Sequence, residues 1–177
     1  MSDEPDGLAA MTDMRHAPIL RLDVSVRAQR LEVVGEKVVI RQFPISTAAN
    51  GHGCVKGSYC TPLGMHRIML KIGHGCQTGT VFVCRRPTGE VFSETLREQF
   101  PGRDWILSRI LWLCGMEPGL NRGGELDSAR RLIYIHGTAD EHAIGRPTSK
   151  GCIRMRNDHV IELFELVPRG LPVRILL

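Results

Sequence analysis

A cysteine and a histidine in the last third of the chain are the residues best suited to covalent chemistry. Cys152 follows Gly151, and His136 lies sixteen positions earlier (152 − 136). The nucleophilic form of cysteine is the thiolate, and a free thiol with a pKa of about 8.5 is mostly protonated at neutral pH. An imidazole can take that proton and later return it to a leaving amine. Because such a pair also occurs by chance, its spacing alone makes it only a candidate.

The residues around this pair supply the other parts of a nucleophilic site. The base needs an acceptor for its second ring nitrogen, and a backbone carbonyl near Gly137 can provide it, since no carboxylate stands at that point of the sequence. The backbone N–H groups of Gly151 and Cys152 are candidates for holding a developing oxyanion. Arg154 suits either a substrate carboxylate or the bracing of this loop.

Two segments around the pair resemble a known signature. His136-Gly137-Thr138, together with residues 144–155, resembles the motif of the L,D-transpeptidase (YkuD-like) family. Residues 44–47 and 61–68 also resemble that family's strand-and-loop pattern, so the resemblance covers about residues 20–177. Lys150 is a departure, because family members often carry His there. The family's base is the earlier His, so Lys150 bears on substrate detail, and its cation favours the thiolate.

The resemblance implies a β-sandwich-like catalytic domain that forms an acyl-enzyme on peptidoglycan stem peptides, at the bond between a diamino acid and D-alanine. It makes Cys152 the nucleophile, His136 the base and Gly137 the carbonyl that orients the base. It implies no cofactor and no metal, and a covalent adduct with carbapenems. The positions that it assigns to the oxyanion or the substrate are Gly151, Ser149, Arg154 and Thr138.

The fate of the acyl group is left open by the resemblance. Water would give an L,D-carboxypeptidase, whereas an amine would give a transpeptidase that forms cross-links or exchanges D-amino acids. The first residues lack the basic start and apolar run of a secretory signal. We therefore expect a cytoplasmic L,D-carboxypeptidase of muropeptide recycling, acting on a stem tetrapeptide or muropeptide. The alternatives are a periplasmic location after processing or export, and an inactive module that binds stem peptides.

The elements that must position these residues are mainly strands. Apolar and polar residues alternate over residues 20–27, which is typical of a half-buried strand. Two hairpins are expected, one across Gly35-Glu36 and one across Pro87-Thr88-Gly89. The further expected elements are strands at 65–72, 131–136 and 173–177 and a helix at about 157–167. We predict a loose leader at 1–17 and a single α+β, mainly β domain at 18–177, β-sandwich-like with a few helices at one edge.

The segment from Trp105 to Leu113 is apolar nearly all round, and Asp104 is a plausible N-cap for it. We expect a covered helix here. Arg109 is an isolated charge on this segment, so it needs a partner, either a structural carboxylate or a substrate carboxylate. With the loop that follows, the helix would form a lid over a small, carboxylate-bearing peptide.

Composition excludes several classes of protein. The 177 residues carry a net charge of +4, which is not that of a nucleic-acid binder, and no apolar run is long enough to span a membrane. The steps Arg85-Arg86 and Arg130-Arg131 are interpreted as solvated faces. The six cysteines are expected to be thiols. The tetrapeptide Gly-His-Gly-Cys occurs at 51–54 and 73–76, but His-x-Cys is not a usual zinc spacing, and we expect no metal there.

Overall fold

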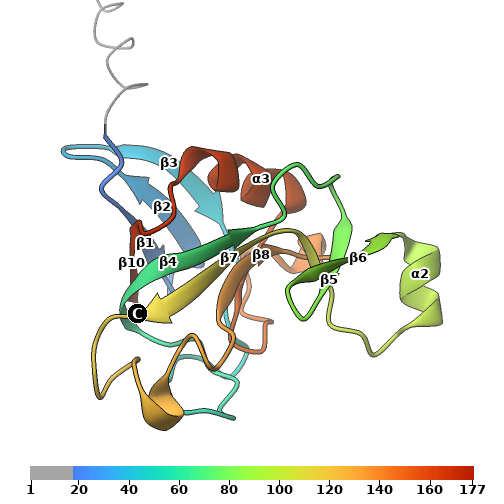
Figure 1. Ribbon diagram of the computed structural model, residues 1–177. Coiled ribbons are helices and arrows are strands. Elements are labelled where there is room, and N and C mark those ends of the chain that lie inside the picture. Colours follow the sequence, from blue (N-terminus) through green and yellow to red (C-terminus); the bar gives the residue numbers. More distant parts are fainter. Residues whose placement is uncertain (1–17) are drawn as a thin grey trace, which may run out of the picture.

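The computed structural model of the chain describes residues 18–177, in which the strands form one connected, mixed sheet (Figure 1). The leader expected over residues 1–17 lies outside the described residues. The strand order is β3-β2-β1-β10-β4-β7-β5-β6, with β8 paired to β7 and to β9. The predicted α+β, mainly β class is confirmed. The strands are β1 (Arg21–Ser25), β2 (Arg30–Val34), β3 (Val39–Pro44), β4 (Gly64–Ile72), β5 (Thr80–Val83), β6 (Arg86–Val91), β7 (Ile106–Gly115), β8 (Tyr134–Gly137), β9 (Ile153–Met155) and β10 (Pro172–Leu176).

The first and last strands lie side by side within the sheet. β1 pairs antiparallel with β2 and parallel with β10. The predicted alternation holds in β1, where Leu22 and Val24 are fully buried. They belong to a core that includes Val160, Leu163 and Phe164 of helix α3 (Asn157–Leu166). Figure 1 shows α3 lying across the sheet near β3. Burial of these apolar side chains is the main force that holds the helix on the sheet.

The helix predicted over 105–113 is wrong, because this segment forms β7. The strand pairs with β4 on one side and with β8 on the other. Its side chains are buried on both faces, with Leu111 and Leu113 in the core beneath α3 and Ile110 in a second cluster on the opposite face. A strand covered on both faces has a continuous apolar run, which periodicity cannot distinguish from a buried helix.

The second hairpin turns earlier than predicted. Its two-residue turn is Cys84-Arg85, with φ values of 49° and 67°. Pro87 is already part of β6 and pairs there with Phe82 of β5. Positive φ at both positions gives the twist that suits a tight hairpin. Proline is tolerated because β6 is an edge strand. A short helix, α2 (Glu94–Gln99), was not predicted; Ser93 Oγ caps it by accepting from Leu96 N at 3.2 Å.

Two short 3₁₀ turns complete the chain, η1 (Gly124–Leu126) and η2 (Glu141–Ala143). β8 lies between β7 and β9, and α3 begins directly after β9. The strands predicted near 131–136 and 173–177 and the helix at 157–167 are present with slightly shifted ends. Among residues 18–177, no helix is both long and apolar enough to span a bilayer.

Candidate active site

Cys152 lies one residue before β9, beside the start of β8. The parallel ladder pairs Ile135 with Ile153 and His136 with Arg154, so Cys152 falls next to Tyr134. Because side chains alternate along a strand, Tyr134, His136 and Cys152 project from the same face of the sheet. The thiol packs there against the apolar cluster that contains Tyr134. The register thus brings the predicted nucleophile and base together on adjacent strands.

The sulfur atom makes two hydrogen bonds with backbone groups. The N–H of Tyr134 donates to Cys152 Sγ at 3.4 Å, and the thiol donates to the carbonyl oxygen of Leu132 at 3.4 Å. Within residues 18–177, no hydrogen bond joins this sulfur to the imidazole of His136. The thiol proton therefore points at a carbonyl in the resting enzyme, and bound substrate must redirect it toward the base.

The turn that carries Cys152 is closed by a serine. Ser149 Oγ donates to the carbonyl oxygen of Cys152 at 2.6 Å and accepts from the N–H of Gly151 at 3.2 Å. Ser149 is buried, so these two bonds hold the turn without competition from water. The N–H of Gly151, expected to serve an oxyanion, is engaged with Ser149 in this resting arrangement.

Gly151 is required by its surroundings. Its φ of 121° lies where L-residues are strained, and a Cβ would stand 3.3 Å from the carbonyl oxygen of Cys60. Thr61 Oγ1 donates to the Gly151 carbonyl at 3.0 Å, which ties the nucleophile turn to the loop before β4. A side chain at position 151 would push this turn, and the thiol with it, away from β8.

His136 is buried in β8 and held in one tautomer. Its Nδ1 lies 2.8 Å from the carbonyl oxygen of Gly137. A carbonyl only accepts, so Nδ1 carries the proton and Nε2 is left with a free lone pair. This is the orienting contact predicted for Gly137. The neutral imidazole thus presents Nε2 as a base.

Burial keeps both members of the pair uncharged at rest. It lowers the pKa of His136 to about 4, against the raising effects of the Gly137 hydrogen bond and Asp104. It raises the pKa of Cys152 to about 11, against the lowering effect of the Tyr134 N–H. Desolvation penalises the charged form of each group. The resting site is therefore a neutral thiol beside a neutral imidazole.

A half-buried amide, that of Asn157, supports the backbone around Gly137. Asn157 Nδ2 donates to the Thr138 carbonyl at 2.9 Å, and Asn157 Oδ1 accepts from Ser108 Oγ at 2.6 Å. A Cβ on Gly137 would collide with Asn157 Oδ1 and stand 2.7 Å from the carbonyl oxygen of Leu107. The side chain of Thr138 accepts from Asp140 N at 3.1 Å, so it fixes the turn after β8. Asn157 and Ser108 were not predicted.

Arg154 is committed to two carboxylates. Its guanidinium lies 3.1 Å from Asp104 Oδ1 and 3.5 Å from Asp140 Oδ2, and the side chain is 11% exposed. Of the two roles predicted for it, the structure shows the bracing contacts. Asp104 raises, and Arg154 lowers, the pKa of both His136 and Cys152, so this ion pair lies within electrostatic reach of the site.

Arg109 lies away from the thiol. Its guanidinium donates to the carbonyl oxygens of Cys76, at 2.8 Å, and Ser108, at 2.7 Å, and stacks over the ring of Phe164 in α3. Phe164 belongs to the core on the face opposite Cys152. The partners of Arg109 are therefore backbone carbonyls and an aromatic ring. Since the segment is a central strand, the expected lid is absent from this part of the described chain.

Two arginines interpreted as solvated are engaged near the site. Arg131 is half-buried, donates to the carbonyl oxygens of Gly53, at 3.0 Å, and Cys60, at 2.7 Å, and lowers the pKa of Cys152. Arg85 donates to Tyr134 Oη at 3.1 Å and stacks on Trp112. Their sequence context gave no signal, because the acceptors come from distant loops.

The described residues offer no metal centre at the repeated Gly-His-Gly-Cys segments. No group of three or more His, Cys, Asp or Glu side chains in residues 18–177 is placed to hold an ion. His74 is exposed and lies 4.0 Å from Glu165, and Cys76 packs beside the cluster that contains Cys152. The six cysteines are all free thiols.

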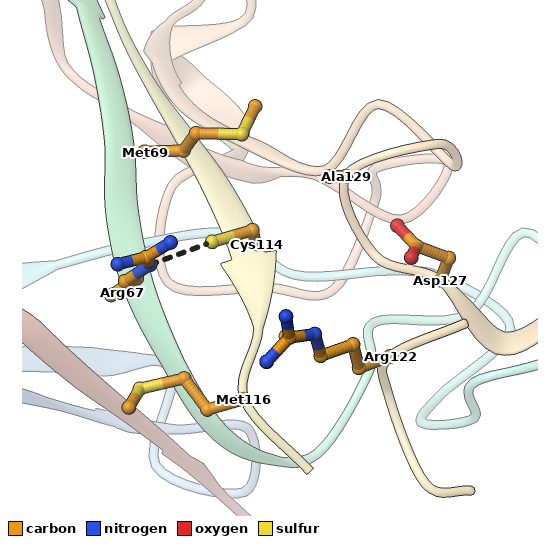
Figure 2. Close-up of a pocket in the computed structure, with 8 residues that line it drawn as sticks. Arg67, Met69, Cys114, Met116, Arg122, Asp127 and Ala129 are labelled. Carbon is orange, nitrogen blue, oxygen red and sulfur yellow. Dashed lines mark hydrogen bonds between the residues drawn. The ribbon is translucent and has the colours of Figure 1, made fainter. Parts of the chain in front are cut away.

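The cavity shown in Figure 2, of about 510 Å³, lies elsewhere. It is lined by Arg67, Cys114 and Arg122, with Met69 and Met116, and Arg67 Nε donates to Cys114 Sγ at 3.3 Å. Neither Cys152 nor His136 lines it. The candidate active site is therefore located by the chemistry of Cys152 and His136 and not by this cavity.

Comparison with known proteins gives consistent matches. The profile of the L,D-transpeptidase catalytic domain family, YkuD, matches residues 20–175. The chain is 56% identical over 174 residues to "Putative L,D-transpeptidase YkuD" of Bacillus subtilis, covering 98% of this chain and 93% of that protein. A match to "Putative L,D-transpeptidase YqjB" of the same organism is 49% identical over 45 residues and spans only 25% of this chain and 26% of that one.

The fold also matches solved structures. The structure of LD transpeptidase LdtMt1 in complex with imipenem superimposes with a TM-score of 0.53 at 20% identity, covering 89% of this chain and 59% of that chain. An L,D-transpeptidase from Mycobacterium smegmatis superimposes with a TM-score of 0.51 at 17% identity, covering 91% and 59%. At these identities the likeness concerns the fold, and this chain spans about three-fifths of each.

Proposed function

Because the chain belongs to the L,D-transpeptidase catalytic domain family, we propose that it cleaves the bond between the diamino acid and terminal D-alanine of peptidoglycan stem peptides, as an L,D-carboxypeptidase. The observation that carries the chemistry is the position of Cys152 directly before β9, beside the strand that carries His136, whose free nitrogen is Nε2. A thiol and a neutral base on adjacent strands suit acyl transfer.

The proposed reaction needs only the thiol of Cys152, the imidazole of His136 and a water molecule. His136 Nε2 takes the thiol proton, and the sulfur attacks the carbonyl carbon of the diamino acid. The tetrahedral intermediate collapses to a thioester as the C–N bond breaks, and the imidazolium returns the proton to the amine of D-alanine. Water then attacks the thioester, with His136 as base, and the carboxylate product leaves as the thiol is restored. The N–H of Tyr134, which bonds Sγ at rest, lies where an oxyanion could be stabilised.

Hydrolysis is the finer part of the proposal. It rests on the expectation that the enzyme works in the cytoplasm on soluble muropeptides, where wall polymer is not the acceptor. A fusion that reports export tests this location directly. Activity of an export reporter would contradict it.

The test of the reaction is mass spectrometry of a tetrapeptide, or its disaccharide form, incubated with the enzyme with and without a free D-amino acid. Loss of one alanine in both samples supports the carboxypeptidase. Exchange or dimer formation without hydrolysis identifies a transpeptidase instead. Cys152→Ser should abolish either product, and the absence of any product from the wild type would favour a module that only binds stem peptides.

A carbapenem provides a second test. LdtMt1, with which this chain shares its fold, has been solved in complex with imipenem. We propose that imipenem acylates Cys152, adding one inhibitor mass to the intact protein. The same mass on Cys152→Ser would show that another group reacts.

A further inference from the structure

A second, smaller cavity opens directly beside the thiol. It has a volume of about 220 Å³, and Leu132 and Ile133 line it. Leu132 is also the residue whose carbonyl oxygen accepts the thiol proton of Cys152, at 3.4 Å. The rest of its lining is Lys56, Gly57, Tyr59, Arg130, Arg131 and Lys150. We name this cavity the basic pocket, because four of these residues are cationic and none is a carboxylate.

The cations of the basic pocket are differently engaged. Arg131 is fixed by its bonds to the carbonyl oxygens of Gly53 and Cys60, so its charge has a set position. Lys56 has a loose partner, Glu125, at 4.0 Å. Arg130 and Lys150 are exposed, and the structure gives neither side chain an ion pair within residues 18–177. Arg130 also lowers the pKa of Asp127, so that carboxylate lies within its electrostatic reach. Four cations near two carboxylates still leave a net positive charge, which attracts an anion.

The position of the pocket relative to the base shows which part of a substrate it would meet. Tyr134, whose N–H bonds the sulfur, stands between Leu132 and His136 in the sequence. Leu132 lies in the turn before β8, with a φ of 60°, whereas His136 lies inside the strand, two residues beyond Tyr134. The pocket and the base therefore lie on either side of the thiol along the chain. The leaving amine must lie next to His136 to receive its proton. The acyl portion of the substrate therefore extends toward the basic pocket.

We propose that the basic pocket binds a carboxylate on the acyl side of the substrate, the part that stays on Cys152 in the acyl-enzyme. This rests on the proposed function for the identity of the substrate. Lysine and arginine bind carboxylates through charge-assisted hydrogen bonds. The pocket then selects stem peptides with a free acyl-side carboxylate over their carboxamide forms, and Lys150 is a specificity residue.

The first test needs no peptide substrate. Iodoacetate and iodoacetamide both alkylate the thiolate with loss of iodide, but only iodoacetate is an anion. The ratio of their rates at Cys152, measured by mass spectrometry of its peptide because five other thiols are present, reports the charge beside the sulfur. Each cation removed at about 7 Å in water should lower this ratio about two- to threefold. Lys150→Ala with Arg130→Ala should lower it about sevenfold, whereas Lys150→Arg keeps it.

Arg169→Ala is the matched control, since Arg169 is exposed in the loop after α3. It removes one positive charge from the whole protein, as each substitution of the double variant does, and should leave the ratio unchanged. A ratio in the double variant within twofold of the wild type, with an unchanged melting temperature, would overturn the basic pocket as a charged site.

The second test uses two tetrapeptides that share the leaving D-alanine and differ only in a free or amidated acyl-side carboxylate. The wild type should prefer the free acid about tenfold in kcat/KM, and the double variant should lose the preference through KM. Equal turnover of both peptides by the wild type overturns the inference while the proposed function stands. A lowered alkylation ratio with neither peptide cleaved leaves the pocket in place and refutes the proposed function.

Discussion

The backbone N–H of Tyr134 donates to the sulfur of Cys152 at 3.4 Å, although the two residues are eighteen positions apart in the chain. The contact exists because β8 and β9 run parallel, which sets the start of one strand beside the residue before the other. It lowers the pKa of the thiol, but burial outweighs it and sets the pKa at about 11. Because burial keeps the thiol protonated at rest, its reactivity depends on how a bound substrate changes the surroundings of the sulfur.

The free enzyme should show this directly in its alkylation by iodoacetamide. The rate at Cys152 follows the thiolate fraction, so it should keep rising between pH 9 and about pH 11. The measurement is a rate at each pH on the Cys152 peptide. A plateau below pH 8 would mean that the resting site already stabilises the thiolate.

Replacing the base tests its role. His136→Gln removes the group that accepts the thiol proton and should lower kcat/KM by about 10²- to 10⁴-fold. Alkylation of Cys152 at high pH, where hydroxide removes the proton, should stay within a few fold of the wild type. A variant that keeps most of its turnover at neutral pH would show that another group is the base.

Gly137→Ala should damage both fold and activity. Its Cβ would collide with Asn157 Oδ1 and stand 2.7 Å from the Leu107 carbonyl oxygen, so β8 must shift and carry His136 with it. We expect a loss of about 1–3 kcal/mol in the free energy of unfolding and at least tenfold in kcat. Gly102→Ala is the control, because a Cβ there meets nothing within 4 Å; it should melt and turn over like the wild type.

The stability of the protein should fall in mild acid. Burial lowers the pKa of His66 and of His136 to about 4 from 6.5, so both bind protons more readily in the unfolded chain. Their contribution is complete above pH 6.5 and is lost as the pH falls toward 4. Denaturant titrations across this range should show a loss of a few kcal/mol, and His66→Asn should flatten the slope. A stability independent of pH from 7 to 4.5 would contradict both shifts.

The sequence predicts those elements whose structure depends mainly on the pattern of their own residues. The alternation in β1 and the amphipathic pattern of α3 predict those elements, and the segment around Cys152 identifies the family. The apolar run of β7 was misassigned, because its two buried faces are created by partners far away in the chain. The same reason hid Asn157 and Ser108, whose contacts depend on how α3 meets β7. Arg109 was expected to need a carboxylate, yet it bonds backbone carbonyls that no pattern reveals.

The two faces of β7 pack into two different clusters of side chains. Leu111 and Leu113 face the core beneath α3, whereas Ile110 and Trp112 belong to the cluster that packs against the thiol of Cys152. Alternate residues of this strand therefore have different roles. Leu111 and Leu113 stabilise the fold, whereas Ile110 and Trp112 position the proposed active site. Genetic tolerance should alternate along the strand accordingly, with variants at 111 and 113 rescued by chaperones or low temperature, and those at 110 and 112 well expressed but poorly active.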